Sequence, residues 1–284
     1  MAVDKRLPAA EYQRPPAAVR PSRPSRLLEY FVILEIICQV ALLSPTLAPL
    51  RIVFRIAVFG VSLGLLLVLP GQGKLHPAAK AAFFVIAIVA LSMLNPGINS
   101  ATSAAAQSAL YLATVAPLFW VPRLRIDLAE MRRVLFLQWA FQAVSATVGI
   151  LQVYFPARFQ FTVSSVVQGN GAGYLGMEQF HNVYGQVVYR PMGLTDTPGG
   201  AAAAGFFAVL FAAAFFLLER RKWMQAAYAG AMLVGMAAIY LSQVRVMLVM
   251  EVVCMTAFVA LMSWRVARTQ SQAPGRKTGG RRMA

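Results

Sequence analysis

Charged residues are scarce in this sequence: they make up 13% of its 284 residues, against 59% that are hydrophobic. A soluble domain of this size needs roughly a quarter of its residues charged to keep its surface in water. Apolar runs such as 52–69 and 206–218 are long enough, or nearly so, to span ~30 Å of hydrocarbon as helices. The composition therefore excludes a soluble globular domain and predicts a polytopic membrane protein.

Cysteine and histidine are also rare, with two of each in the chain. Cys38 and Cys254 both lie inside apolar runs, so we interpret them as buried small side chains and not as a disulfide. The sequence contains no metal-ligand spacing, no nucleophile elbow and no phosphate-binding glycine loop. We therefore predict neither a metal nor a cofactor.

Acidic residues are few: 10 carboxylates face 26 lysines and arginines, giving a formal charge of +16. The basic residues lie at the ends of apolar runs and do not form a patterned soluble domain, which excludes a nucleic-acid partner. Residues 1–27 are rich in proline and arginine, and no small-residue cleavage site follows the first apolar run. We predict that 1–27 is a disordered cytoplasmic tail lying against anionic membrane lipids.

The apolar runs predict an all-α fold of about eight transmembrane helices with both termini cytoplasmic. The predicted spans are 28–48, 51–70, 80–95, 104–121, 134–155, 200–218, 223–243 and 246–264. This divides the chain into the tail, five helices in 28–155, one long outer loop at 156–199, three helices in 200–264 and a basic cytoplasmic tail at 265–284.

This topology places all but five of the 26 lysines and arginines on the cytoplasmic side, as the positive-inside rule requires. The exceptions are Arg51, Arg55, Arg158, Arg190 and Arg245. Arg158 follows a span end and is interpreted as an anchor. An arginine at the outer end of a span is costly unless it faces a wet cavity, a partner or a bound anion. We predict that the other four bind an anionic substrate, with snorkelling to the headgroups as the alternative.

Two carboxylates and a polar stripe lie inside the predicted spans. Glu251 matches Arg55 in depth, so a buried pair between them is one hypothesis and a protonated Glu251 is the other. Glu35 has no obvious partner at its depth. The stripe lies on one face of the fifth predicted helix and comprises Gln138, Gln142, Ser145 and Gln152. Such a stripe either lines a cavity or, more often, hydrogen-bonds to neighbouring helices.

The outer loop at 156–199 is long enough to predict a functional segment. Its aromatic residues offer stacking surface of a kind that suits sugars or an interface; they are Tyr174, Phe180, Tyr184 and Tyr189. Glu178 and His181 are the titratable groups of its middle part. A histidine in a loop is more often plain surface than a catalytic group, so both interpretations of His181 remain open.

The end of this loop carries Arg190-Pro191-Met192-Gly193, followed by Asp196-Thr197-Pro198 and a span rich in alanine, glycine and phenylalanine. Two spans later, "LSQVRVMLV" supplies Ser242 and Arg245 at the start of the last predicted helix. This pattern, over residues 187–250, resembles the conserved core of the O-antigen ligase and polysaccharide polymerase superfamily.

The resemblance implies a metal-independent glycosyltransferase at the outer face of the bacterial inner membrane. Such a protein moves a glycan from an undecaprenyl-diphosphate carrier onto a sugar hydroxyl, together with other polysaccharide-assembly proteins. Arg190 and Arg245 would hold the diphosphate, since a guanidinium grips phosphate oxygens bidentately. Gly193 belongs to the same substrate-binding element. His181, Glu178 or Asp196 would be the general base, although Asp196 is also expected to orient Arg190 or to cap the helix that follows.

One departure from the family keeps other functions open. Members of the superfamily usually continue into a second large outer loop with further arginines and a histidine, and none follows here before Ala284. The alternatives are a non-catalytic membrane subunit of a polysaccharide-export complex and a transporter or flippase for an anionic lipid-linked substrate. A transporter usually shows internal repeats, and no repeat of fixed period stands out in this sequence.

Overall fold

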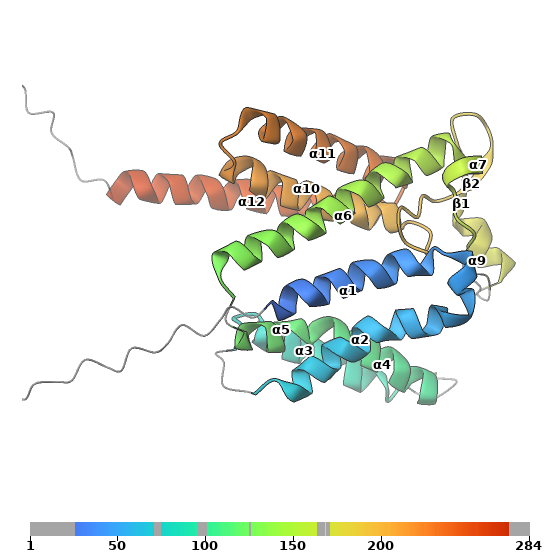
Figure 1. Ribbon diagram of the computed structural model, residues 1–284, viewed down its shortest axis with the longest axis horizontal. Helices are drawn as coiled ribbons and strands as arrows, with labels where there is room; N and C mark the ends of the chain where they lie inside the picture. The colour runs from blue at the N-terminus through green and yellow to red at the C-terminus, as the bar shows by residue number, and fades with distance from the viewer. Residues whose placement is uncertain are drawn as a thin grey trace, which may run out of the picture.

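The computed structural model describes residues 26–70, 75–95, 101–124, 126–163, 168 and 171–272. It is a bundle of long helices with a small loop region gathered at one end (Figure 1). Residues 1–25 of the tail predicted at 1–27, and most of the tail predicted at 265–284, lie outside the described residues; Leu27 already belongs to the first helix.

Each of the eight predicted spans overlaps a long helix, although 28–48 extends past the end of its helix and 104–121 is broken by Pro117. The long helices are α1 (Leu27–Leu42), α2 (Arg51–Val68), α3 (Ala79–Ser92), α4 (Ala101–Val115), α6 (Leu128–Tyr154), α10 (Gly200–Leu218), α11 (Lys222–Leu241) and α12 (Arg245–Gln272). Short turns lie between them at η1 (Pro45–Leu50), α5 (Pro117–Trp120) and η2 (Val121–Arg123). Among the described residues, five helices are long and apolar enough to cross a membrane, namely α2, α6, α10, α11 and α12.

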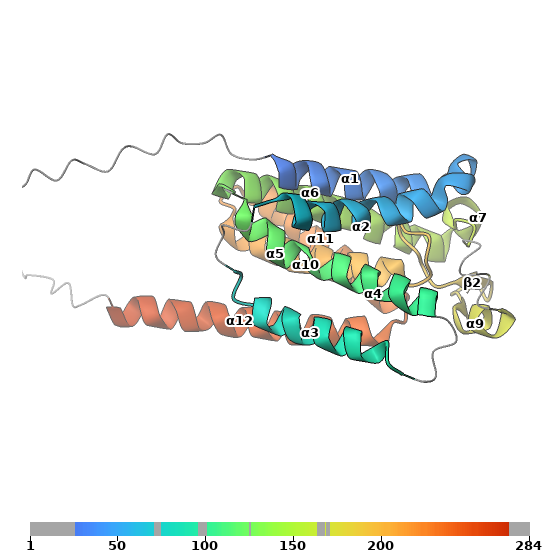
Figure 2. The same ribbon diagram turned by 90° about the horizontal axis from the view of Figure 1, so that it is seen from below.

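These five helices make the chain a multi-pass membrane protein. Helices α1, α3 and α4 have 16, 14 and 15 residues, which is shorter than a full span, so the count of eight spans stays a prediction. Helix α12 runs to Gln272, eight residues past the predicted end at 264, because no proline or glycine interrupts the polar stretch after it. Both views show α12 extending beyond the rest of the bundle (Figures 1 and 2).

Helix α10 is the centre of the bundle. Half of its apolar span is buried inside the protein, against 6% for α2 and for α12, so those two helices turn most of their surface toward lipid. Small residues allow this packing: a Cβ atom on Gly205 of α10 would lie 2.5 Å from the carbonyl oxygen of Gly235 on α11. Glycine at this crossing lets the two helix backbones approach directly.

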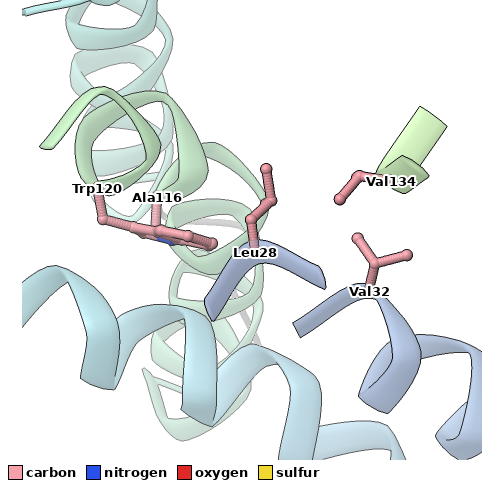
Figure 3. Packing of buried hydrophobic residues seen from close by; sticks show 5 residues of the cluster. All are labelled: Leu28, Val32, Ala116, Trp120 and Val134. Carbon is pink, nitrogen blue, oxygen red and sulfur yellow. The ribbon is translucent and has the colours of Figure 1, made fainter. Parts of the chain in front are cut away.

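The helices form two groups, with α6, α10, α11 and α12 on one side and α1 to α5 on the other (Figure 1). Contacts between α1 and α6 join the groups. A buried cluster seals this junction, made by Leu28, Val32, Ala116, Trp120 and Val134 (Figure 3). The cluster also contains a polar contact, because the indole of Trp120 donates to the Ser62 hydroxyl, which donates in turn to a carbonyl of α4.

The segment 156–199 contains short elements of its own: α7 (Pro156–Phe159), α9 (Ala172–Met177), β1 (Gln179–His181) and β2 (Val187–Tyr189). Strands β1 and β2 pair antiparallel, with Phe180 opposite Val188. Helices dominate the described residues, as the all-α prediction requires, and this hairpin is the exception. It lies at the end of the bundle where α6 finishes and α10 begins (Figure 1).

Candidate functional site

Polar side chains of α6 hold the turn that follows β2. The Gln152 carboxamide oxygen accepts from the backbone N–H groups of Met192 and Gly193 at 2.7 and 2.9 Å, and its nitrogen donates to the Gly193 carbonyl at 3.0 Å. The Ser145 hydroxyl accepts from the Leu194 N–H at 2.9 Å. Buried backbone groups need such partners, so α6 fixes the path of the chain just after Arg190.

Ser145 and Gln152, two residues of the polar stripe predicted on this helix, therefore hydrogen-bond to a neighbouring segment. Gln138 contributes in the same way, since its amide nitrogen donates to Glu35 on α1 at 3.1 Å. This contact also gives Glu35 the partner that the sequence did not reveal. For Gln138, Ser145 and Gln152 the helix–neighbour alternative stated for the stripe is the correct one.

Gly193 is buried and has a φ of +64°. A Cβ atom at this position would lie 2.5 Å from the Ser145 hydroxyl oxygen and 2.8 Å from the Ser145 carbonyl oxygen. Both the left-handed backbone and the lack of space require glycine here. The structure thus gives Gly193 a role in packing the turn against α6, while the substrate contact predicted for it stays a prediction.

The β1–β2 hairpin is anchored to the end of α6 by Asn182. Its side-chain oxygen accepts from the backbone N–H groups of Tyr184 and Gln186, both at 3.0 Å, and its nitrogen donates to the Val153 carbonyl at 3.1 Å. Asn182 therefore shapes the turn and ties it to the bundle at once. This fixes the ends of the hairpin, where His181 closes β1 and Arg190 follows β2.

The turn between α11 and α12 is also sharply defined. The buried Ser242 hydroxyl donates to the Ala238 carbonyl at 2.6 Å. Gln243 has a φ of +54°, and it is the one non-glycine residue with a positive φ in the described part of the chain. A left-handed glutamine costs about 1–3 kcal/mol, and such strain is common at functional sites. The turn places Arg245 at the first position of α12.

These two segments, 55 residues apart from Arg190 to Arg245, line one cavity of about 700 Å³. Its walls include His181 and Arg190 from the hairpin side and Gln243 and Arg245 from the α11–α12 turn. Phe180 and Tyr240 add aromatic surface. The structure thus brings together Arg190 and Arg245, the two arginines predicted to hold a diphosphate, and His181, one of the three predicted bases.

The cavity is electropositive. No carboxylate lies among its lining residues in the described chain, which carry two guanidinium groups. Glu178 stands behind Arg190 at 3.7 Å from its Nη1 atom, too far for a hydrogen bond, and the Arg190 side chain is 32% exposed. Arg245 is exposed at the N-terminus of α12, where the helix dipole is itself positive. A cation at this helix end is unfavourable by itself and becomes favourable with a bound anion.

Arg55 and Asp196 pair with each other outside this cavity. The Arg55 guanidinium donates to the Asp196 carboxylate, and the Asp196 side chain is only 9% exposed. Two expectations for Asp196 are therefore wrong, namely that it orients Arg190 or caps α10: Glu178 and not Asp196 neighbours Arg190, and Gly199 is the N-cap of α10, with no side-chain cap bond. Its role as a candidate base stays a prediction. The hypothesis of an Arg55–Glu251 pair is wrong too, because both carboxylate oxygens of Glu251 lack a hydrogen-bond partner among the described residues.

Glu251 instead faces a second, apolar cavity of about 380 Å³ between α11 and α12. This cavity shares Ile239, Tyr240 and Leu248 with the electropositive one, so the two cavities lie side by side along α12. Arg51 lines neither cavity and begins α2, and its buried Nε atom has no hydrogen-bond partner among the described residues. Sequence reasoning missed Gln243 and Tyr240, since neither residue type signals a strained turn or a cavity wall.

A scan against protein-family models, a search of curated proteins and a search of solved structures each found no match for this chain. The functional argument therefore rests on the site itself.

Proposed function

We propose that this protein transfers a glycan from an undecaprenyl-diphosphate carrier to a sugar hydroxyl at the outer face of the bacterial inner membrane. The observation that carries the proposal is the meeting of Arg190 and Arg245 on one cavity, with no carboxylate among its lining residues in the described chain. Two guanidinium groups match the two phosphates of a diphosphate ester. The adjoining apolar cavity suits the first isoprene units of a lipid carrier.

The proposed reaction is a displacement at the anomeric carbon of the carrier-linked sugar. The acceptor hydroxyl oxygen forms a bond to this carbon while the bond from the carbon to the diphosphate oxygen breaks. The bonding electron pair leaves with the diphosphate, whose growing charge Arg190 and Arg245 stabilise. Charge stabilisation by preorganised donors commonly contributes a factor of about 10²–10³ in rate for each donor.

His181 is the base that best fits the site. It is exposed, ends β1 and lines the cavity, so a neutral imidazole there can take the proton of the acceptor hydroxyl. The other two candidates are not among the lining residues of the cavity: Glu178 stands behind the Arg190 guanidinium, and Asp196 is bound by Arg55. We therefore assign the base to His181, with Glu178 positioning Arg190.

The test replaces Arg190 and Arg245 singly by alanine and measures the amount and length of surface polymer in cells. Each variant should lower polymer synthesis about 100-fold or more. Arg158→Ala is the matched control: it also removes an exposed arginine from the outer loop, but one that does not line the cavity. His181→Gln should lower synthesis while leaving carrier binding intact.

Normal polymer from Arg190→Ala and Arg245→Ala at normal protein levels would refute the catalytic proposal. The two alternative functions predict different defects. A flippase variant would accumulate the lipid-linked glycan on the cytoplasmic face, whereas a transferase variant would accumulate it on the outer face. A non-catalytic subunit would tolerate the arginine changes as long as complex assembly is unaffected.

A further inference from the structure

A second charged cavity lies at the opposite end of the bundle, where α1 and α6 begin and α10 turns into α11. Its volume is about 660 Å³, close to that of the cavity at the other end. It is separate from the site of the proposed function and shares no lining residue with it. The positive-inside rule predicts that this end faces the cytoplasm.

Three arginines and two carboxylates line this cavity: Arg132, Arg133, Arg221, Glu29 and Glu219. The lining is therefore one positive charge in excess. The ion pairs within it are loose, at 3.5 Å from Arg132 to Glu219 and 3.6 Å from Arg133 to Glu29. Charge-assisted hydrogen bonds are usually about 2.7–2.9 Å long. The guanidinium groups in these longer pairs therefore keep unused donors.

Glu219 is bound mainly by the backbone. The N–H groups of Arg221 and Arg220 donate to its carboxylate at 3.2 and 2.9 Å, and they hold the pKa of this carboxyl below its ordinary value of 4.5. The Arg132 side chain remains 64% exposed and that of Arg133 50% exposed. The guanidinium groups are thus accessible to an anion from outside the protein.

The floor of the cavity is apolar and aromatic. Phe136, Met224 and the buried Tyr228 line the cavity together with the arginines, and so does Trp223, which is 66% exposed. A tryptophan at this height is typical of the boundary between lipid and water. A free inorganic anion has no apolar surface to bury against these side chains, whereas an amphiphile with an anionic headgroup does.

Trp139 continues this surface along α6, about two turns after Arg132. Its ring contacts that of Tyr228 with centroids 4.8 Å apart, and its indole Nε1 is buried without an acceptor in the described chain. Trp139 also lines an apolar cavity of about 290 Å³ between α6 and α11. A buried N–H without an acceptor costs about 1–3 kcal/mol, so an oxygen atom of a bound ligand would stabilise this donor.

We propose that the two cavities together bind one anionic glycerophospholipid. The phosphate lies among Arg132, Arg133 and Arg221, one acyl chain follows the apolar cavity between α6 and α11, and the Trp139 N–H donates to an ester carbonyl. The single positive charge in excess matches a headgroup with one net negative charge, such as phosphatidylglycerol, and not a zwitterionic one. The occupant comes from the bilayer, since the cavity combines a charged rim with an apolar floor.

The test measures lipid binding to the purified full-length protein in detergent by native mass spectrometry. Phosphatidylglycerol should bind at one preferred site, and phosphatidylcholine should bind at least tenfold more weakly. Inorganic phosphate should fail to compete at concentrations similar to those of the lipid. Equal binding of the two lipids would overturn the proposal, and so would full competition by inorganic phosphate.

Two variants test the assigned contacts. Arg221→Gln changes an exposed side chain, so the fold should persist, and it should raise the Kd for phosphatidylglycerol about tenfold or more. Arg158→Gln, an exposed arginine at the other end of the bundle, is the matched control and should leave the Kd unchanged. An unchanged Kd in Arg221→Gln would refute the assignment of the phosphate.

Trp139→Phe tests the ester contact. It keeps an aromatic ring in place and removes the N–H, so it should weaken binding of ester-linked phosphatidylglycerol severalfold. Ether-linked phosphatidylglycerol lacks the carbonyl, and its affinity should be the same for the variant and the wild type. An equal loss for both lipids would show that Trp139 acts only through packing and would overturn this contact.

Discussion

Gly193 offers a quantitative test of how tightly the turn after Arg190 is held. Gly193→Ala adds one methyl group at a residue whose φ is +64°, where its Cβ would lie 2.5 Å from the Ser145 hydroxyl oxygen. Gly185→Ala is the matched control, because its φ is +73° and no atom lies within 4 Å of the added Cβ. Both variants carry the same backbone strain, and only one carries the steric overlap.

The expected magnitudes follow from these two terms. A left-handed backbone costs an ordinary L-residue about 1–2 kcal/mol, so Gly185→Ala should lower the free energy of unfolding by that amount. Overpacking adds about 1–3 kcal/mol, and Gly193→Ala should therefore lose about 2–5 kcal/mol in total. The difference between the variants measures the contact between the turn and α6.

The free energy of unfolding can be followed by tryptophan fluorescence during titration with sodium dodecyl sulfate in mixed micelles. Gly193→Ala should unfold at a clearly lower fraction of the denaturing detergent than Gly185→Ala. If the two variants unfold together, the close contact between Gly193 and Ser145 is absent, and the position assigned to Arg190 loses its support. Polymer synthesis by Gly193→Ala should fall in parallel with the displacement of the turn.

The other predictions concern helix packing, an ion pair and pH. Gly235→Ala should destabilise the protein by about 1–3 kcal/mol in the same detergent titration, because its Cβ would lie 2.7 Å from a carbonyl oxygen of α10. Gly230→Ala is the control, because an added Cβ there meets open space in the same helix, and it should be neutral or slightly stabilising. A double-mutant cycle on Arg55→Ala and Asp196→Ala should give a coupling free energy of about 1–3 kcal/mol, and additive losses would rule out the pair. Backbone donors depress the folded-state pKa of Glu219. The stabilisation that this carboxylate provides is therefore complete above pH 4.5 and is lost as the pH falls through the folded-state pKa. Glu219→Gln should remove this part of the acid dependence of the melting temperature.

Much of the fold is readable from the sequence because apolar length determines it. The predicted span 200–218 coincides with α10, since its apolar run is bounded by a Pro-Gly-Gly turn before it and by Glu219 after it. The meeting of Arg190 and Arg245 on one cavity was likewise accessible, because the predicted topology places both residues at the outer ends of spans, against the positive-inside rule. In each case a one-dimensional quantity, length or depth, contains the answer.

The partner of Arg55 was not accessible in this way. An α-helix rises about 1.5 Å per residue, so the position of a residue in a predicted span gives the depth of its side chain in the membrane. By this measure Glu251 and Arg55 match in depth. It does not give the direction in which either side chain points or which helices are neighbours. Asp196, 141 residues away in sequence, meets Arg55 because the turn before α10 reaches α2. Gln152 likewise needed the fold to show which loop it holds.

The Arg55–Asp196 pair has a consequence for how the helices assemble while the protein is being synthesised. Its two members are 141 residues apart, and at roughly 5–20 residues per second the ribosome adds Asp196 about 7–28 s after Arg55. Helix α2 therefore enters the membrane well before its carboxylate partner exists. The first five predicted spans would be inserted in a provisional arrangement, and synthesis of the segment around Asp196 would then secure α2 against the later helices. A ribosome stalled before residue 196 should leave α2 easier to extract from the membrane than one stalled after α10, which makes the order of assembly a property of the chain that can be measured.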